Sequence, residues 1–243
     1  MIIKDRTQEM YRFARPIFWR NDDDHYLYSQ GGTANIVKLA NEYFILTANH
    51  CMDKKDEGYE IEDCHIPWRM TSEAFCKIGE GCNFPVNAEE GELDEIHGDI
   101  RIHKLEGPSL DDIPLEEGEY HEIPNFEMET APLPFFLTGY PKFDQNIDYE
   151  KKELLSAGHN IQGHIESTTD DYILKFVSKD LVGVDADGFS GGLITSNIYG
   201  NARIQGLCIQ GSRNKEIDFV RFIRIEIIGD MLTKAYEKLI AVN

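Results

Sequence analysis

The sequence predicts a mostly β protein that ends in one α-helix, and three patterns indicate this. Short apolar runs separated by turn residues recur along the chain from Ala34 onward, which is typical of strands in an antiparallel barrel or sandwich. Stretches with helical periodicity are few before the C-terminus. There, Ile228, Leu232, Ala235 and Leu239 fall on one face of a helix, so a C-terminal amphipathic helix is expected.

The expected strands follow in chain order. Runs 34–39 and 43–46 flank Ala40-Asn41-Glu42 and predict a hairpin. Further strands are expected at 100–105, 135–138, 160–167, 172–177, 193–195, 203–210 and 219–225. A turn signal at 197–201 separates two of these runs. Residues 1–30 are polar and aromatic, and we interpret the acidic run Asp22-Asp23-Asp24 within them as a solvated loop. We interpret the acidic stretch 88–129 as mainly loops.

Composition restricts the classes of partner. The chain has 243 residues, of which 41% are hydrophobic, enough for a sizeable core. Lys and Arg number 24 against 44 Asp and Glu, a net charge of -20. So acidic a surface repels phosphate backbones and anionic lipid, which argues against a nucleic-acid or membrane binder. Basic peptides or proteins are the electrostatically natural partners.

Cysteine usage and the N-terminus indicate a cytoplasmic chain. Residues 1–10 mix charges and carry no apolar signal core, and no run approaches the ~20 apolar residues of a membrane span. The five cysteines are odd in number and irregularly spaced, which favours reduced thiols. Cys64-His65 with Cys76 and Cys82 is a conceivable zinc site, but no Cys-x-x-Cys pair supports it. We expect neither a metal nor a cofactor.

Three segments together point to acyl transfer. They read Leu46-Thr-Ala-Asn-His50-Cys51, Gly98-Asp99-Ile-Arg-Ile-His-Lys-Leu105 and Asp187-Gly-Phe-Ser190-Gly-Gly192. A serine hydroxyl needs an adjacent base, and an imidazole can take its proton and return it to the leaving group. A carboxylate behind the ring fixes its tautomer. Each segment alone is common, but jointly they predict a catalytic triad of His50, Asp99 and Ser190. The N–H groups of Gly188 and Ser190 are expected to hold the oxyanion.

In these motifs the sequence resembles the trypsin-like serine peptidases. The three segments look like the family's Thr-Ala-Ala-His-Cys, Asp-Ile-Ala-Leu and Gly-Asp-Ser-Gly-Gly motifs, and the resemblance covers roughly residues 30–240. It implies one peptidase domain over 1–243, built from two packed six-stranded antiparallel β-barrels. The first barrel, about 25–125, would supply His50 and Asp99. The second, about 130–225, would supply Ser190, and a helix would follow at 226–242.

The resemblance also implies where a peptide substrate binds. Ile209-Gln210-Gly211 would pair with its backbone as an extra strand. Val184 would form the base of the primary pocket, and its apolar side chain favours an uncharged substrate residue. Three charged residues near this pocket leave alternatives open. Asp185 or Asp187 would favour a basic substrate residue, whereas Arg221 would favour an acidic one.

Two departures from the family pattern concern activation and redox state. Phe189 replaces the aspartate that pairs with the new amino terminus after zymogen cleavage, so that route is not expected. Activity that is constitutive, or that is controlled by an activating partner or by loop ordering, is expected instead. Cys51 lacks a cysteine at its usual partner position near Gln30-Gly31. With the Gly-Thr-Ala start at Gly32, this looks more like bacterial members of the family.

Three functions fit these residues. The first is an intracellular serine endopeptidase. The second is a peptidase-fold binding module without turnover, which the intact His50, Asp99, Ser190 and Gly188 disfavour. The third is an acyl-ester hydrolase that uses the same triad.

Overall fold

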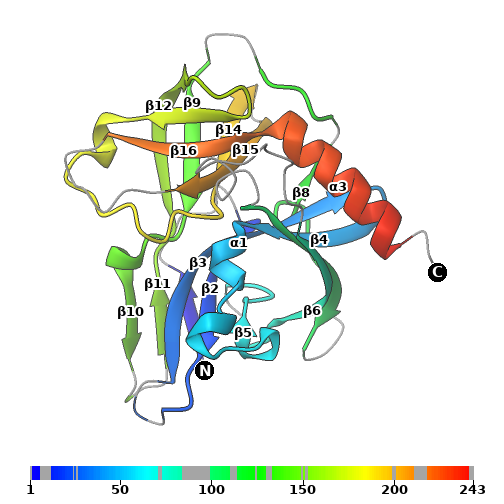
Figure 1. Cartoon of the computed structure of the whole chain (residues 1–243). Coiled ribbons are helices and arrows are strands. Elements are labelled where there is room, and N and C mark those ends of the chain that lie inside the picture. Colours follow the sequence, from blue (N-terminus) through cyan, green and yellow to red (C-terminus); the bar gives the residue numbers. More distant parts are fainter. Residues whose placement is uncertain are drawn as a thin grey trace.

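The structure is a computed structural model, and it contains two large β-sheets, one small β-sheet and a long C-terminal helix (Figure 1). It describes residues 2–5, 12–23, 25, 27–70, 73–83, 99–109, 114–123, 125–129, 133–148, 150, 153–198, 201–210 and 218–240.

The second half of the chain forms a closed six-stranded barrel. Its strands are β9 (Phe135–Gly139), β12 (His159–Ser167), β13 (Ile173–Val177), β14 (Leu193–Ile198), β15 (Asn201–Gln210) and β16 (Phe219–Arg224). Around the barrel their order is β12-β13-β16-β15-β14-β9, and every pair is antiparallel. Phe176, Phe189 and Phe222 are fully buried in its core. Closure removes the exposed sheet edges of this half.

The first half forms a curved seven-stranded sheet. Its strands are β2 (Ala14–Arg20), β3 (Tyr28–Leu39), β4 (Glu42–Thr47), β5 (Cys64–His65), β6 (Cys76–Asn83), β7 (Arg101–Pro108) and β8 (His121–Glu122). The order is β5-β2-β3-β4-β7-β6, with β8 paired to β3. The backbone N–H of Cys76 donates to the Ile66 carbonyl at 2.8 Å, so the two ends of the sheet approach each other without a continuous ladder.

A small third sheet joins the N-terminus to a hairpin. Strand β1 (Ile2–Asp5) pairs in parallel with β11 (Glu153–Ser156), which pairs antiparallel with β10 (Gln145–Asp148). The hairpin is inserted between β9 and β12 of the barrel (Figure 1).

The C-terminal helix α3 (Ile225–Leu239) packs on both large sheets, as Figure 1 shows. Its buried face includes Ile228, Leu232, Ala235 and Leu239, which confirms the predicted amphipathic helix. These side chains share one core cluster with residues of the first sheet and of the barrel, among them Leu46 and Leu207. The other helices among the described residues are short: α1 (Asn49–Met52), η1 (Lys55–Glu57), η2 (Ile61–Asp63), η3 (Lys142–Asp144) and η4 (Lys179–Leu181).

Every strand predicted from an apolar run is present, with its bounds shifted by a few residues. The predicted hairpin is confirmed, because β3 and β4 pair through Leu39 and Glu42 around Ala40, whose φ is 53°.

Two expectations about the first half differ from the structure. No strand was predicted within residues 1–30, yet they contain β1, β2 and the start of β3. Strand β2 is buried almost throughout, so it lacks the polar–apolar alternation of a one-sided strand. Two closed barrels were also expected, whereas the described strands give one closed barrel and one open sheet. Parts of the acidic stretch 88–129, namely 88–98, 110–113 and 124, lie outside the described residues.

Candidate active site

His50 and Asp99 are brought together by two neighbouring strands. His50 lies in α1 just after β4 ends, and Asp99 lies just before β7 begins. These strands are antiparallel, with Thr47 opposite Arg101, so the end of one meets the start of the other. His50 Nδ1 lies 2.6 Å from Asp99 Oδ2, and the backbone N–H of His50 donates to Asp99 Oδ1 at 2.9 Å. The carboxylate therefore orients the imidazole ring.

This contact changes the electrostatics of His50. Burial lowers its pKa, but the hydrogen bond to Asp99 and the proximity of Cys51 outweigh that effect and raise the pKa from 6.5 to about 10. The side chain of His50 is 51% exposed, whereas that of Asp99 is 13% exposed. The imidazole thus reaches solvent while its carboxylate partner is shielded.

The Ser190 loop docks onto the first sheet beside His50. The Ser190 carbonyl accepts a hydrogen bond from the Thr33 N–H at 2.9 Å and from Cys51 Sγ at 3.4 Å. Cys51 directly follows His50 in the chain. Asn35 Nδ2 donates to the Gly191 carbonyl at 2.5 Å, and Thr33 Oγ1 donates to the Gly188 carbonyl at 2.8 Å. These contacts place the serine loop of the barrel against the histidine segment of the first sheet.

Ser190 and His50 themselves are neighbours without a direct bond. Ser190 is 9% exposed. Within the described part of the chain, no hydrogen bond joins its hydroxyl to the His50 ring. Hydrogen bonds between a nucleophile and its base are often long before substrate binds and tighten in the complex.

Two backbone N–H groups of the serine loop remain available. The N–H of Phe189 donates to the Ala186 carbonyl, and that of Gly191 donates to the Cys208 carbonyl. The N–H groups of Gly188 and Ser190 have no acceptor among the residues that the structure describes. Gly188 has a φ of 97°, and a Cβ there would lie 2.6 Å from the backbone N of Lys142. Only glycine fits this turn, and the turn leaves the two predicted oxyanion donors unoccupied.

Phe189 occupies an apolar position within the loop. Its side chain is fully buried in the barrel core, and a Cβ on Gly139 would touch its ring at 3.0 Å. The apolar Phe189 ring therefore occupies the space beside Ser190, and it offers no negative charge that could pair with a buried ammonium group.

The residues predicted to bind substrate are spread along the rim of the barrel. Val184 is half-buried against the barrel core. Asp185 Oδ1 accepts a hydrogen bond from the Asp187 N–H at 3.0 Å. Ile209 is buried in the large shared core, and Gln210 is exposed.

The position of Arg221 follows from its pairing with the end of β15. Gln210 pairs with Arg221 of β16 after a register shift, and Arg221 Nη1 donates to Gln210 Oε1 at 2.9 Å. Arg221 therefore lies beside Gln210 at the end of β15. Gly211 lies outside the described residues.

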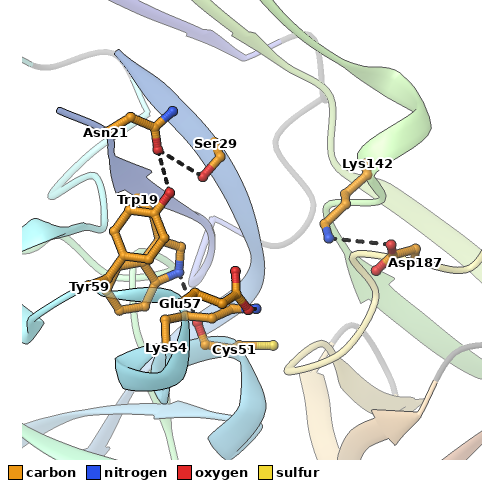
Figure 2. A network of polar contacts seen from close by, with 9 residues as sticks. All are labelled: Trp19, Asn21, Ser29, Cys51, Lys54, Glu57, Tyr59, Lys142 and Asp187. Carbon is orange, nitrogen blue, oxygen red and sulfur yellow. Dashed lines mark hydrogen bonds and ion pairs between the residues drawn. The ribbon is translucent and has the colours of Figure 1, made fainter. Parts of the chain in front are cut away.

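Several polar residues that support the site were not found from the sequence (Figure 2). Trp19 Nε1 donates to the Cys51 carbonyl at 3.2 Å, and Tyr59 donates to Asn21 Oδ1 at 2.7 Å. In the second half of the chain, Lys142 Nζ lies 3.3 Å from Asp187 Oδ2. For the supporting residues Thr33 and Asn35, the only sequence signal was the Gly-Thr-Ala start at Gly32.

Other chemistry-bearing groups lie outside this cluster. All five cysteines are buried and free, and burial raises the pKa of Cys76 to about 12. Within the described ranges, no group of three or more His, Cys, Asp or Glu side chains is arranged to hold a metal ion. No helix in those ranges is long and apolar enough to span a bilayer.

No protein-family model matches the chain, and neither does any curated protein.

Proposed function

We propose that the protein is a serine endopeptidase with a trypsin-like architecture, in which His50, Asp99 and Ser190 form the catalytic triad. The observation that carries this proposal is the docking of the serine loop on the histidine segment, where Thr33 and Cys51 both bind the Ser190 carbonyl. In this proposal the open seven-stranded sheet is the counterpart of the family's first barrel. The nearly joined strands β5 and β6 support that assignment.

In the proposed mechanism each catalytic group has one role in each half-reaction, namely the formation and the hydrolysis of an acyl-enzyme. The neutral His50 ring takes the proton of the Ser190 hydroxyl while the hydroxyl oxygen attacks the scissile carbonyl, and the ring returns the proton to the leaving amine, which leaves an acyl ester on Ser190. In the second half-reaction the ring takes a proton from a water molecule that attacks this ester and returns it to the departing Ser190 oxygen. Asp99 holds the tautomer and stabilises the transient imidazolium. The N–H groups of Gly188 and Ser190 bind the oxyanion, a contact typically worth about 3 kcal/mol per donor.

Control by a partner or by loop ordering is part of the proposal. Phe189 gives a freed amino terminus no carboxylate to meet, and β1 pairs with β11 instead. The hairpin that carries β11 begins beside η3, where Lys142 bonds Asp187 through both its backbone and its side chain. A ligand on the hairpin would therefore act on the serine loop through this contact.

Labelling with a fluorophosphonate tests the proposal. The probe is expected to label the wild-type protein at Ser190 and to leave the Ser190→Ala variant unlabelled. Peptide hydrolysis should fall at least ~10³-fold in Ser190→Ala and in His50→Ala, with unchanged circular dichroism. A Ser178→Ala variant, which alters another buried serine, should be labelled normally. Equal peptide hydrolysis in wild type and Ser190→Ala would overturn the triad. Turnover of esters without turnover of peptides would replace the peptidase with an esterase.

A further inference from the structure

A pocket of about 410 Å³ opens on the barrel beside the turn between β12 and β13, the first half of β13 and the middle of β16. It is lined by Ser167, Thr168, Thr169, Asp170, Ile173, Lys175 and Arg221. Lys175 and Arg221 are directly opposite each other in the β13–β16 register, so their side chains share one face of the sheet. Two cations thus meet in one cavity of a protein whose net charge is -20.

Neither cation forms an ion pair with a carboxylate within the described part of the chain. Lys175 Nζ lies 4.4 Å from the centroid of the Phe219 ring and has no carboxylate partner there. Glu166 is opposite Lys175 in the β12–β13 register, but its Oε1 contacts His164 Nε2 at 3.1 Å. Arg221 donates one N–H to the neutral Gln210 side chain, so its charge is also uncompensated.

Asp170, the carboxylate among the lining residues, accepts hydrogen bonds from its own loop. Asp170 Oδ1 accepts hydrogen bonds from the N–H groups of Tyr172 at 2.7 Å and Ile173 at 3.2 Å. Thr168 Oγ1 donates to the Ile173 carbonyl at 2.6 Å. These bonds fix the loop that walls the cavity. The lining therefore holds two positive charges and one negative charge, with the hydroxyls of Ser167 and Thr169 beside them.

The pocket is continuous with the strand that leads to the serine. In β15, Cys208 exchanges backbone hydrogen bonds with Gly191 and Gly192, next to Ser190. Two residues further on, Gln210 contacts Arg221 at the rim of the pocket. At about 3.4 Å per strand residue, an extended peptide lying along β15 would pass Gln210 two to four residues from its scissile bond.

We propose that this pocket binds the carboxylate side chain of an acidic substrate residue, two to four positions on the amino side of the scissile bond. The arginine fork suits a carboxylate, and the lysine adds a second charge. The protein as a whole is strongly acidic, so the local pair of cations in this pocket is what favours an acidic side chain there. This inference rests on the proposed function for its peptide, but its test does not depend on turnover.

The test uses binding to the inactive Ser190→Ala protein. Fluorescein-labelled peptides carry a single Glu at successive positions, each paired with the same peptide carrying Gln, and fluorescence anisotropy gives Kd. At one position the Glu peptide should bind about tenfold more tightly than its Gln partner. Adding Lys175→Gln and Arg221→Gln should reduce that ratio to about one. The Lys179→Gln control, which removes an exposed lysine of the same barrel, should keep it. High salt should weaken the preference.

A charge-reversed variant tests the proposal even if the double variant misfolds. Arg221→Glu should reverse the preference towards a Lys peptide at the same position, which an unfolded protein cannot do. A Glu/Gln ratio near one at every position, with Ser190 of the wild-type protein labelled by fluorophosphonate, overturns the pocket and leaves the peptidase. Tight Glu binding that requires Lys175 and Arg221, with Ser190 unlabelled, supports the pocket and overturns the peptidase. If neither the preference for Glu nor the labelling of Ser190 is observed, both the pocket and the peptidase are overturned.

Discussion

His50 and Asp99 contact each other twice, through the ring at 2.6 Å and through the backbone N–H at 2.9 Å. A carboxylate that binds both groups fixes the imidazole relative to its own main chain. It leaves Nε2 as the ring nitrogen available to another partner. The same contact favours the charged ring, so orientation and basicity have one origin.

The rate of fluorophosphonate labelling should therefore depend on pH through His50. The neutral ring is the active form, and its pKa is raised, so labelling should rise with pH to a midpoint between 6.5 and about 10. In Asp99→Asn the midpoint should move down towards 6.5, because the hydrogen bond to the charged ring is lost. The rate should also fall by roughly 10³–10⁴-fold, since the amide favours the wrong tautomer.

A stability measurement checks the same pKa independently. A histidine whose pKa is raised on folding contributes stability that is complete below about 6.5 and disappears as pH rises through the folded value. The wild-type Tm should thus fall more between pH 7 and 10 than the Tm of His50→Ala. A labelling midpoint at or below 6.5 would contradict the pairing of His50 with Asp99.

The serine loop should tolerate no side chain at Gly191. Its φ is 84°, and a Cβ there would collide with the Thr33 carbonyl oxygen, which belongs to the first sheet. Gly58 has a similar φ of 89° but open space around it. Gly191→Ala should cost more than about 2 kcal/mol beyond Gly58→Ala, because both variants share the backbone strain and only one has the collision. Urea unfolding measures the difference, and equal losses would refute the close approach.

Much of the fold could be predicted because the pattern of apolar residues is local. The β3–β4 hairpin and α3 follow from strand runs and from one helical stripe. The His50–Asp99 contact was likewise expected, because the motifs carry both residues at strand ends. Strand β2 could not be found in this way, since it is buried on both faces and lies in a segment that otherwise reads as polar.

The supports of the site could not be predicted because they are contacts between distant parts of the chain. Asn35 donates a hydrogen bond to the carbonyl of Gly191, which lies 156 positions later in the sequence, and no local sequence pattern predicts such a bond. The role of Arg221 also depended on register. A shift between Cys208 and Gln210 decides which face the neighbouring side chains occupy, and a slip of one residue would have moved Arg221 to the other face.

An N-terminal extension should leave activity largely unchanged. Phe189 is buried in hydrocarbon and provides no carboxylate for a freed amine. A folded domain fused ahead of Met1 should change the rate of peptide hydrolysis by no more than a few-fold, with a C-terminal fusion as the control. If removal of the N-terminal fusion raised the rate by orders of magnitude, activation by a new amino terminus would be restored as the mechanism.

The residue directly before the scissile bond should be uncharged and of medium size. Val184 offers an apolar side chain, and placing an unpaired Lys or Arg against it would cost several kcal/mol. Among the charges that could change this preference, Asp185 is engaged by the Asp187 N–H and Asp187 by Lys142. Arg221 lies in β16, beside Gln210 at the end of β15.

A positional peptide library measures this preference, and Asp185→Ala provides the decisive comparison. Its carboxylate is held within the turn, so the substitution should lower the rate for all peptides alike and leave the preferred residue unchanged. Lys142→Ala removes the ammonium partner of the Asp187 carboxylate, so it is the contrasting variant and should raise the rate for peptides with Lys or Arg before the scissile bond. Dominant cleavage after Lys or Arg that vanishes in Asp185→Ala would show that this carboxylate turns into the pocket and that Val184 does not set the specificity.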